Sequence, residues 1–554
     1  MQNLRPLLFF AWLFVAYLLW QAWGDFNRPP APPAGSPASA PAAMAAGDVP
    51  DASRAPAAAV PAAGEDAAAA PAETTAPARR VTVETDLLRL VIDTRGGSIV
   101  SAQLLGYPST LHSEQPVELL TDDPARLFHA QSGVVSSTGA APDHNAIYEA
   151  EHDGYVLQGD TLEVPLVWRD GDVTVRKTFV LRRSDYAIEV RHDIRNDGAA
   201  PWSGSVYRQL QRVPLRTSAG FSLTDATAIT FHGAAWYSPE ERFEKLQFDE
   251  FASDPLQRTI TGGWAGLLQH YFFAAWIPDA QQPNDYSTVR LPGTSRYLIR
   301  QVGATPTVAP GSEGSDSARL WVGPKLQNVL PDVADGLELT IDYGIFTILA
   351  KPLFWTLDKL HSLVRNWGVA IILLTLLIKL AFYKLSEAQY RSMARMRKMQ
   401  PRMAQLKERY GDDRQKMNAA MMELYKKEKI NPLGGCLPML VQIPVFIALY
   451  WVLLESVELR QAPFFGWIQD LSTRDPYFVL PVLNGAVMWL TQKLSPTPGM
   501  DPIQKRIFQI MPIMFSVMFA FFPAGLVLYW LTNGALSLLQ QTIITRRIEA
   551  GAKA

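Results

Sequence analysis

The sequence predicts a membrane α-helical bundle of six spans, five of which form a core, joined to a large antiparallel β-sandwich domain outside the membrane. Three observations predict this class. One apolar run lies at the N-terminus and five lie in the second half of the chain. Polar and apolar residues alternate over roughly 260 residues between them, as in the strands of a sandwich. Basic residues gather beside particular apolar runs, although the formal net charge of the 554 residues is only -2. No DNA partner is expected.

The chain begins with an apolar run, Leu4 to Trp23, that is long enough to cross a bilayer. No small-residue cleavage pattern follows at once, which favours an uncleaved transmembrane anchor over residues 1–28. A cleaved signal peptide stays open as an alternative. Residues 29–80 are rich in Ala and Pro and cannot bury a core, so a disordered linker is expected there.

Residues 81–340 carry the alternating pattern of the predicted sandwich. In the segment 172–191, for example, two strand-like runs are separated by the turn residues Arg183-Ser184-Asp185. The segment has no histidine pair at metal spacing, no phosphate-binding glycine loop and no nucleophile elbow. We therefore expect no metal site, no cofactor and no catalytic residue.

Two lone histidines in the sandwich, His232 and His270, lie beside aromatic residues, which is typical of packed or surface positions. Acidic residues such as Glu240, Glu241 and Glu250 show no arrangement that identifies an acid/base pair. A membrane-anchored carbohydrate-active enzyme nevertheless stays open as an alternative.

A helix with an apolar stripe and interspersed charges is predicted over residues 341–365, and its place just before a span favours the membrane interface. The first core span, 366–383, contains Lys379. A charge inside a span costs about 2.5 to 3.5 kcal/mol, so this lysine indicates a polar or wet surrounding. Its stem could instead reach the near interface. Thr375, one helical turn earlier, and Gln442 in another apolar run favour a polar stripe.

Residues 384–430 contain thirteen Lys or Arg against six Asp or Glu, which places this segment on the cytoplasmic side. The helical pattern is interrupted at Gly411-Asp412-Asp413, so a hairpin of two antiparallel helices is expected. Methionines follow its apolar face at helical spacing. They either pack the two arms together or form a soft surface for apolar clients. The methionines proposed to contact clients are Met393, Met396, Met399, Met403, Met417 and Met421.

The remaining four core spans and their loops fall within residues 431–541, followed by a basic tail at 542–554. Two of these apolar runs are short, which suggests a locally thinned bilayer or a buried position in the bundle. The run Pro523-Ala524-Gly525 predicts a sharp reversal between the last two spans. The basic residues near these spans place both termini in the cytoplasm and the sandwich outside.

Motifs shared with one known family occur along nearly the whole chain outside the linker. They are Asn366-Trp367-Gly368, Ala388-Gln389-Tyr390, Tyr410-Gly411-Asp412-Asp413, Asn431-Pro432-Leu433-Gly434-Gly435-Cys436, Gln442-Ile443-Pro444, the run from Val457 to Phe464, Phe522-Pro523-Ala524-Gly525-Leu526 and, in the sandwich, Gly262-Gly263-Trp264 and Gln269-His270-Tyr271-Phe272. The sequence closely resembles the bacterial membrane insertase family YidC, of the Gram-negative type with a large periplasmic domain.

The resemblance implies a five-span core around a hydrophilic groove that opens to the cytoplasm and to lipid. Lys379 stands at the groove position that is usually arginine, so the charge is kept and the bidentate fork is lost. Thr375, Gln442 and Tyr529 fall at further groove positions. Lys384 replaces a proline common after the first core span.

The implied activity is insertion and folding of inner-membrane proteins, alone or with the Sec translocon. The implied partners are nascent membrane proteins, the Sec translocon with its accessory subunits, the ribosome and signal recognition pathway, and the lipid bilayer. A small-solute transporter is a rival class, but it predicts paired repeats with broken helices, and the sequence has no internal repeat.

Overall fold

The computed structural model describes residues 48–50, 78–215, 230–411, 413–427, 437–494 and 502–550. The predicted anchor at 1–28 and most of the linker lie outside these residues, as do the tail residues 551–554. Asp48–Ala554 forms one compact unit that contains the strands and helices described below.

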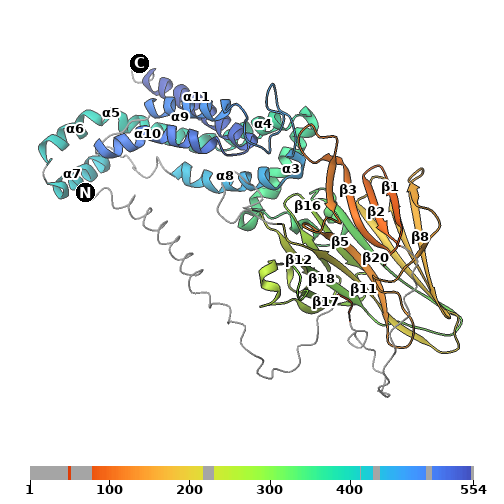
Figure 1. The fold of residues 1–554 in the computed structure, drawn as a ribbon. Helices are drawn as coiled ribbons and strands as arrows, with labels where there is room; N and C mark the ends of the chain where they lie inside the picture. The colour runs from red at the N-terminus through yellow and green to blue at the C-terminus, as the bar shows by residue number, and fades with distance from the viewer. Residues whose placement is uncertain are drawn as a thin grey trace. The chain divides into compact units, whose positions relative to one another are not determined.

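Two β-sheets form the predicted sandwich (Figure 1). The strands are β1 (Arg80–Glu84), β2 (Leu88–Asp93), β3 (Ser98–Pro108), β4 (Pro116–Leu120), β5 (Phe128–Ser136), β6 (Glu149–Ala150), β7 (Gly154–Val156), β8 (Thr161–Asp170), β9 (Val173–Arg182), β10 (Ala187–Asn196), β11 (Trp202–Arg212), β12 (Gly233–Ser238), β13 (Arg242–Leu246), β14 (Gln257–Thr261), β15 (Trp264–Leu268), β16 (Phe272–Pro278), β17 (Pro283–Arg290), β18 (Tyr297–Gly303), β19 (Thr307–Val308) and β20 (Ser312–Pro324).

The first sheet has the order β14-β17-β18-β11-β5-β3-β2-β1-β7, with β19 beside β11 and β4 beside β3. The second has the order β13-β12-β15-β16-β20-β10-β9-β8-β6. All pairs are antiparallel except β1 with β7, so the predicted antiparallel sandwich is confirmed. The expected hairpin over 172–191 is also present. It joins β9 to β10 through Ser184, which has a φ of 57°.

In β1 alternation places one face in the core, where Val81 and Val83 are fully buried. Central strands such as β15 and β16 are buried along their whole length. The core also encloses a lysine. The Nζ of Lys177 donates to the carbonyl oxygens of Gly96 and Ser132 at 2.8 and 2.9 Å. Burial lowers the pKa of Lys177 to about 7. This ammonium is therefore held by carbonyl oxygens in place of a counter-ion.

Within the sandwich, η4 (Phe248–Phe251) lies between β13 and β14. After β20, the short segments α2 (Leu330–Val333), η5 (Leu337–Thr340) and η6 (Gly344–Phe346) lead to the longer helix α3 (Thr347–Val364). The predicted helix over 341–365 thus begins later, at Thr347, because the chain first forms 3-10 turns. It ends at Arg365, whose φ is 52°. Ala350, Phe354 and Leu357 are its buried side chains.

The helical region consists of α4 (Trp367–Ala381), α5 (Tyr383–Lys398), α6 (Gln400–Arg409), α7 (Arg414–Lys427), α8 (Leu437–Glu455), η8 (Val457–Leu459), α9 (Val479–Leu494), α10 (Pro502–Phe519) and α11 (Ala524–Ala550). α11 contacts α4, α5, α8 and α9. α10 ends at Phe519 and α11 begins at Ala524, which agrees with the reversal predicted at Pro523.

Two breaks shape the basic segment. The chain bends by 65° between α4 and α5, at Phe382. The first arm of the hairpin is divided into α5 and α6 at Met399. The second arm is α7. The hairpin is therefore built of three helices where two were expected.

Among the described residues no single helix is both long and apolar enough to meet the criteria for a membrane span. The bent pair Trp367–Ala381 and Tyr383–Ser392 meets them jointly, and Val441–Glu455 and Arg506–Phe519 are shorter apolar helices. The predicted number of six spans therefore stays a prediction.

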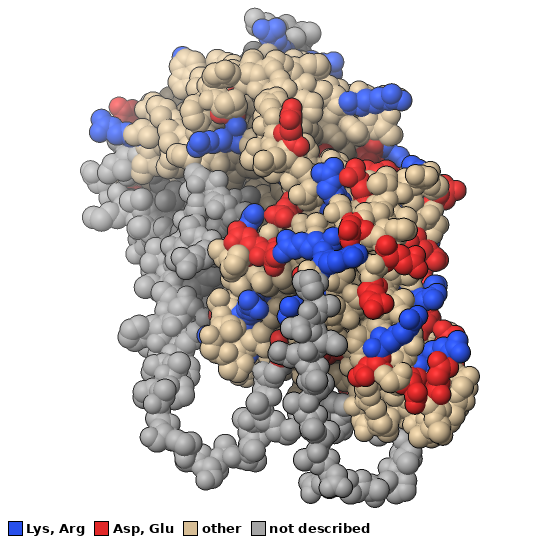
Figure 2. Space-filling model, turned by 45° about the vertical axis from the view of Figure 1, so that its right-hand side comes forward, with Lys and Arg blue, Asp and Glu red and all other residues tan. Residues whose placement is uncertain are grey.

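The surface differs between the two regions. Lys, Arg, Asp and Glu crowd the sandwich in Figure 2, whereas the helical region presents a mostly uncharged surface. Large apolar side chains are exposed on α9 and α10, among them Val482, Trp489, Ile507, Ile510, Ile513, Met514 and Val517. Exposed apolar patches of this kind are typical of surfaces that contact lipid or protein.

The loop after α8 contacts the sandwich. Arg460 Nη2 donates to the carbonyl oxygens of Pro108 and Ser109 at 2.8 and 3.0 Å, and Gln461 Nε2 donates to that of Pro108 at 3.1 Å. His270 Nε2 lies 3.0 Å from the carbonyl oxygen of Leu454. Arg460 and Gln461, two residues of the Val457 to Phe464 motif, thus bind the sandwich.

Candidate functional site

Lys379 lies in the last turn of α4 and is only 6% exposed. Its Nζ donates to the Oγ of Ser537 on α11 at 2.7 Å. Ser537 in turn donates to the carbonyl oxygen of Asn533 at 2.8 Å. An ammonium has three N–H donors, and Ser537 accepts one of them. The positive charge is thus held between apolar helices by a neutral hydroxyl.

A third helix reaches the same point. The hydroxyl of Tyr390, on α5, donates to the carbonyl oxygen of Ser537 at 3.2 Å. This carbonyl belongs to the residue that also holds Lys379, so α4, α5 and α11 are joined at Ser537. After the bend of 65° at Phe382, α5 contacts α11 as α4 does.

Gln442 of α8 contacts the neighbouring turn of α11. Its Nε2 donates to the Oδ1 of Asn533 at 2.7 Å. Asn533 and Ser537 are four residues apart and therefore share one face of the helix. On this polar face of α11, Asn533 contacts Gln442 and Ser537 contacts Lys379. We call Lys379, Gln442, Asn533 and Ser537 the polar stripe residues.

Two other residues expected in the groove are more deeply buried. Thr375 is 1% exposed, and its hydroxyl donates within α4 to the carbonyl oxygen of Ile371 at 2.7 Å. Tyr529 is also 1% exposed, with its ring centroid 6.1 Å from that of Phe446. The side chain of Tyr529 also hydrogen-bonds that of Gln442, and Tyr529 lies four residues before Asn533 on α11. The structure therefore brings Lys379, Gln442 and Tyr529 to one face of α11, while the Thr375 hydroxyl bonds within α4.

Sequence reasoning missed Asn533, Ser537 and Tyr390. A signal was present for the first two, since polar residues spaced by four in an apolar run indicate a polar face. Tyr390 carried no such signal. Its contact depends on the bend between α4 and α5.

The hairpin methionines divide into two groups. Met399 and Met403 are buried and pack against Leu424 and Tyr425 of the opposite arm, which is the packing role that the sequence left open. Met417 is half-buried. The side chains of Met393, Met396 and Met421 lie outside the described residues.

The candidate polar residues of the sandwich have local partners. The ring of His270 is buried and stacks on Tyr271 with centroids 3.7 Å apart. Glu241 pairs with Arg258 at 3.4 Å, and Glu250 accepts from the backbone N–H of Gln247 at 2.8 Å. The described part of the chain contains no group of three or more His, Cys, Asp or Glu arranged to hold a metal ion.

Comparisons with known proteins agree with this architecture. A family model described as the YidC periplasmic domain matches residues 80–356, and one described as the 60Kd inner membrane protein matches residues 359–551. The chain is therefore of the class of inner-membrane proteins that carry a large periplasmic domain. It belongs to the YidC family.

Curated relatives match over their full length. A protein of Stenotrophomonas maltophilia (strain R551-3) is 50% identical over 99% of this chain and 97% of its own. One of Thioalkalivibrio sulfidiphilus (strain HL-EbGR7) is 50% identical over 100% of both chains. Both are described as membrane protein insertase YidC.

Solved structures are less similar. An active YidC insertase crystal structure covers 83% of this chain and 92% of its own, with 20% identity and a TM-score of 0.38. A galactose mutarotase related enzyme from Lactobacillus acidophilus covers 44% of this chain and 97% of its own, with 14% identity and a TM-score of 0.32.

Proposed function

We propose that this chain is a membrane protein insertase without catalytic chemistry, and that the polar stripe residues lower the barrier for a client's hydrophilic segment. The names of its relatives support the activity. The single observation that carries the mechanism is the contact of Lys379 with Ser537, because it places a hydroxyl beside a buried positive charge among apolar helices. Ser537 accepts from one of the three ammonium donors, and among the described residues the other two stay available to water or to a client.

The physical obstacle to insertion is desolvation. A polar loop or tail that crosses hydrocarbon loses its water, at a cost of several kcal/mol for each unsatisfied group. Amide, hydroxyl and ammonium groups on α4, α8 and α11 replace part of that water and shorten the dry path. The driving force is the client's own apolar segment, which partitions into lipid, together with the membrane potential on acidic client residues.

We further propose a topology and a set of partners. Both termini and the basic hairpin lie in the cytoplasm, because positive charges are retained there. The hairpin receives the client from the ribosome and signal recognition pathway, and α4, α8, α9, α10 and α11 are the five core spans. The sandwich serves folding or contacts with the Sec translocon. The exposed apolar surface of α9 and α10 supports a lipid environment for the core.

Substitution of Lys379 tests this function. In proteoliposomes, Lys379→Ala should slow insertion of a client with an acidic translocated tail, whereas Lys379→Arg should retain insertion because the charge is kept. A client with the same apolar segment and a neutral tail is the control and should respond weakly. Equal insertion of the acidic client by all three proteins would refute the role of the charge.

The relative importance of the regions is testable in the same assay. Deletion of part of residues 80–300 should reduce insertion less than disruption of the hairpin at 384–430. A larger loss of insertion from the sandwich deletion than from the hairpin disruption would show that the essential step depends on the sandwich.

A further inference from the structure

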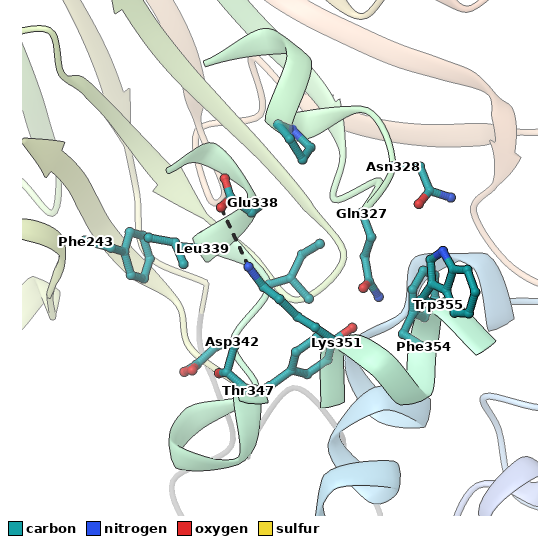
Figure 3. A pocket seen from close by; sticks show the side chains of 13 residues that line it. Phe243, Gln327, Asn328, Glu338, Leu339, Asp342, Thr347, Lys351, Phe354 and Trp355 are labelled. Carbon is teal, nitrogen blue, oxygen red and sulfur yellow. Dashed lines mark ion pairs between the residues drawn. The ribbon is translucent and has the colours of Figure 1, made fainter. Parts of the chain in front are cut away.

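A cavity of about 380 Å³ lies between the end of the sandwich and the first half of α3. Its size is within the range of small-ligand sites. The segment that connects β20 to α3 contributes Glu338 and Asp342, and α3 contributes Lys351 and Trp355. In Figure 3, Lys351 extends across the cavity toward Glu338, while Phe243 and Trp355 lie at opposite sides. Nothing in the proposed insertion mechanism uses this cavity.

The charges in the cavity are open to a ligand. Lys351 Nζ lies 3.7 Å from Glu338 Oε1, which is longer than a hydrogen bond, and their side chains are 52% and 26% exposed. Asp342 pairs with Lys245 at the same wall. Burial opposes ionisation of Asp342, but the hydrogen bond and charge of Lys245 outweigh it and lower its pKa. Asp342 is thus already paired with Lys245, and the cavity offers the Lys351 ammonium and the Glu338 carboxylate to a ligand.

An apolar surface continues from the cavity. Ile345, Ile348 and Trp355 are 89%, 85% and 62% exposed, and Leu363, further along α3, is 78% exposed. A helix that exposes such side chains together with lysines is typical of the membrane interface. Trp355 belongs both to this surface and to the cavity wall. Acyl chains and a headgroup can thus contact adjacent parts of one site.

We propose that this cavity binds the headgroup of a phospholipid with a primary amine, phosphatidylethanolamine, from the adjoining leaflet. The inference rests on the proposed function in one respect, the position of α3 at the membrane surface. The lipid phosphate binds Lys351, and its ammonium binds Glu338 with Asp342 nearby. The acyl chains lie along Ile348 and Trp355.

The charge pattern selects among lipids. A glycerol headgroup carries no cation, so its phosphate would bind Lys351 and leave the Glu338 carboxylate beside a negative charge with no ammonium to pair with it. A choline headgroup is cationic but has no N–H to donate to Glu338. Only a primary ammonium supplies both the charge and the donors, and charge-assisted hydrogen bonds are about twice as strong as neutral ones.

Native mass spectrometry of the full chain tests the proposal. The protein in detergent is mixed with equal amounts of phosphatidylethanolamine, phosphatidylcholine and phosphatidylglycerol that have identical acyl chains. The wild type should retain phosphatidylethanolamine preferentially, and Lys351→Ala should reduce this retention roughly tenfold, the effect of one charge-assisted bond. Lys351→Arg should keep much of it. Glu338→Gln should remove the preference for the primary amine over choline.

Lys359→Ala is the matched control, because Lys359 is an exposed lysine of the same helix that does not line the cavity. Equal retention of the three lipids by the wild type, or equal loss in Lys351→Ala and Lys359→Ala, would overturn the proposal. Soluble phosphoethanolamine should displace the lipid, and failure to do so would assign binding to the acyl chains alone.

Failure of this inference is distinguishable from failure of the proposed insertion mechanism. Lys379→Ala should retain phosphatidylethanolamine like the wild type, because Lys379 is not part of the cavity. If no lipid preference exists while insertion still depends on Lys379, only the headgroup site is refuted.

Discussion

Replacement of Ser537 by alanine should specifically weaken the action of Lys379. The substitution removes one small hydroxyl and with it the acceptor that lies 2.7 Å from the ammonium. A hydrogen bond to a charged group contributes about 1.5 to 3 kcal/mol, and water that enters the space recovers part of this. We expect a net loss of about 1.4 kcal/mol in positioning the charge, which corresponds to a tenfold slower insertion step.

The assay is insertion of the acidic-tail client into proteoliposomes, measured for a double-mutant cycle of Ser537→Ala and Lys379→Ala. In the Lys379→Ala background, Ser537→Ala should have less than about a twofold effect, because the two residues act through one contact. Thr532→Val is the control on the same helix, since the Thr532 hydroxyl donates only within α11, to the carbonyl oxygen of Leu528.

Two results would refute this reasoning. The first is an additive cycle, in which Ser537→Ala slows insertion equally with and without the lysine. The second is an equal loss in Thr532→Val, which would mean that any hydroxyl lost from α11 has the same effect. Ser537→Thr, which keeps the hydroxyl, should insert clients at close to the wild-type rate.

Three further predictions concern stability. Lys177→Met should remove a pH dependence of the free energy of unfolding. The pKa of Lys177 is about 7 in the folded protein, whereas that of an unfolded lysine is about 10.5, so the unfolded state binds more protons between these values. The free energy of unfolding of the wild type should therefore rise by up to about 1.4 kcal/mol per pH unit in this range, measured by denaturant titration followed by tryptophan fluorescence. Gly368→Ala should destabilise by about 1 to 3 kcal/mol in thermal unfolding, because its Cβ would lie 2.1 Å from the Phe464 ring. Arg460→Ala should speed hydrogen exchange at the end of β3, whereas exposed Arg474→Ala, in the same loop region, should not.

The sandwich was predictable because many of its strands carry a period of two, and β1 and β10 follow the pattern closely. Lys379 was identified because an ionisable residue in an apolar run is costly enough to demand an explanation. Its partner was harder to identify. Ser537 is a common residue in an apolar helix, and only the packing of α11 against α4 gives it a role.

Other features depend on tertiary structure in the same way. The sequence predicted the end of the first core span at residue 383, close to the break at Phe382, but no proline there indicated a bend of 65°. Met399 stands at the break between α5 and α6, and helical spacing alone cannot separate packing against the opposite arm from contact with a client. Both features depend on which helix surfaces pack against each other, and the spacing of apolar residues along the sequence does not specify this.

The partner of Lys379 also bears on why lysine is sufficient at this position. A carboxylate beside the ammonium would form a strong pair and neutralise the charge before any client arrived. Ser537 fixes the position of Nζ with a single bond and leaves the net charge unchanged. An arginine presents five donors and requires more acceptors, of which the Asn533 amide oxygen is already bound by Gln442. A point charge held by one hydroxyl therefore suits the few acceptors on this face of α11, and it can bind and release a passing carboxylate without breaking a permanent ion pair.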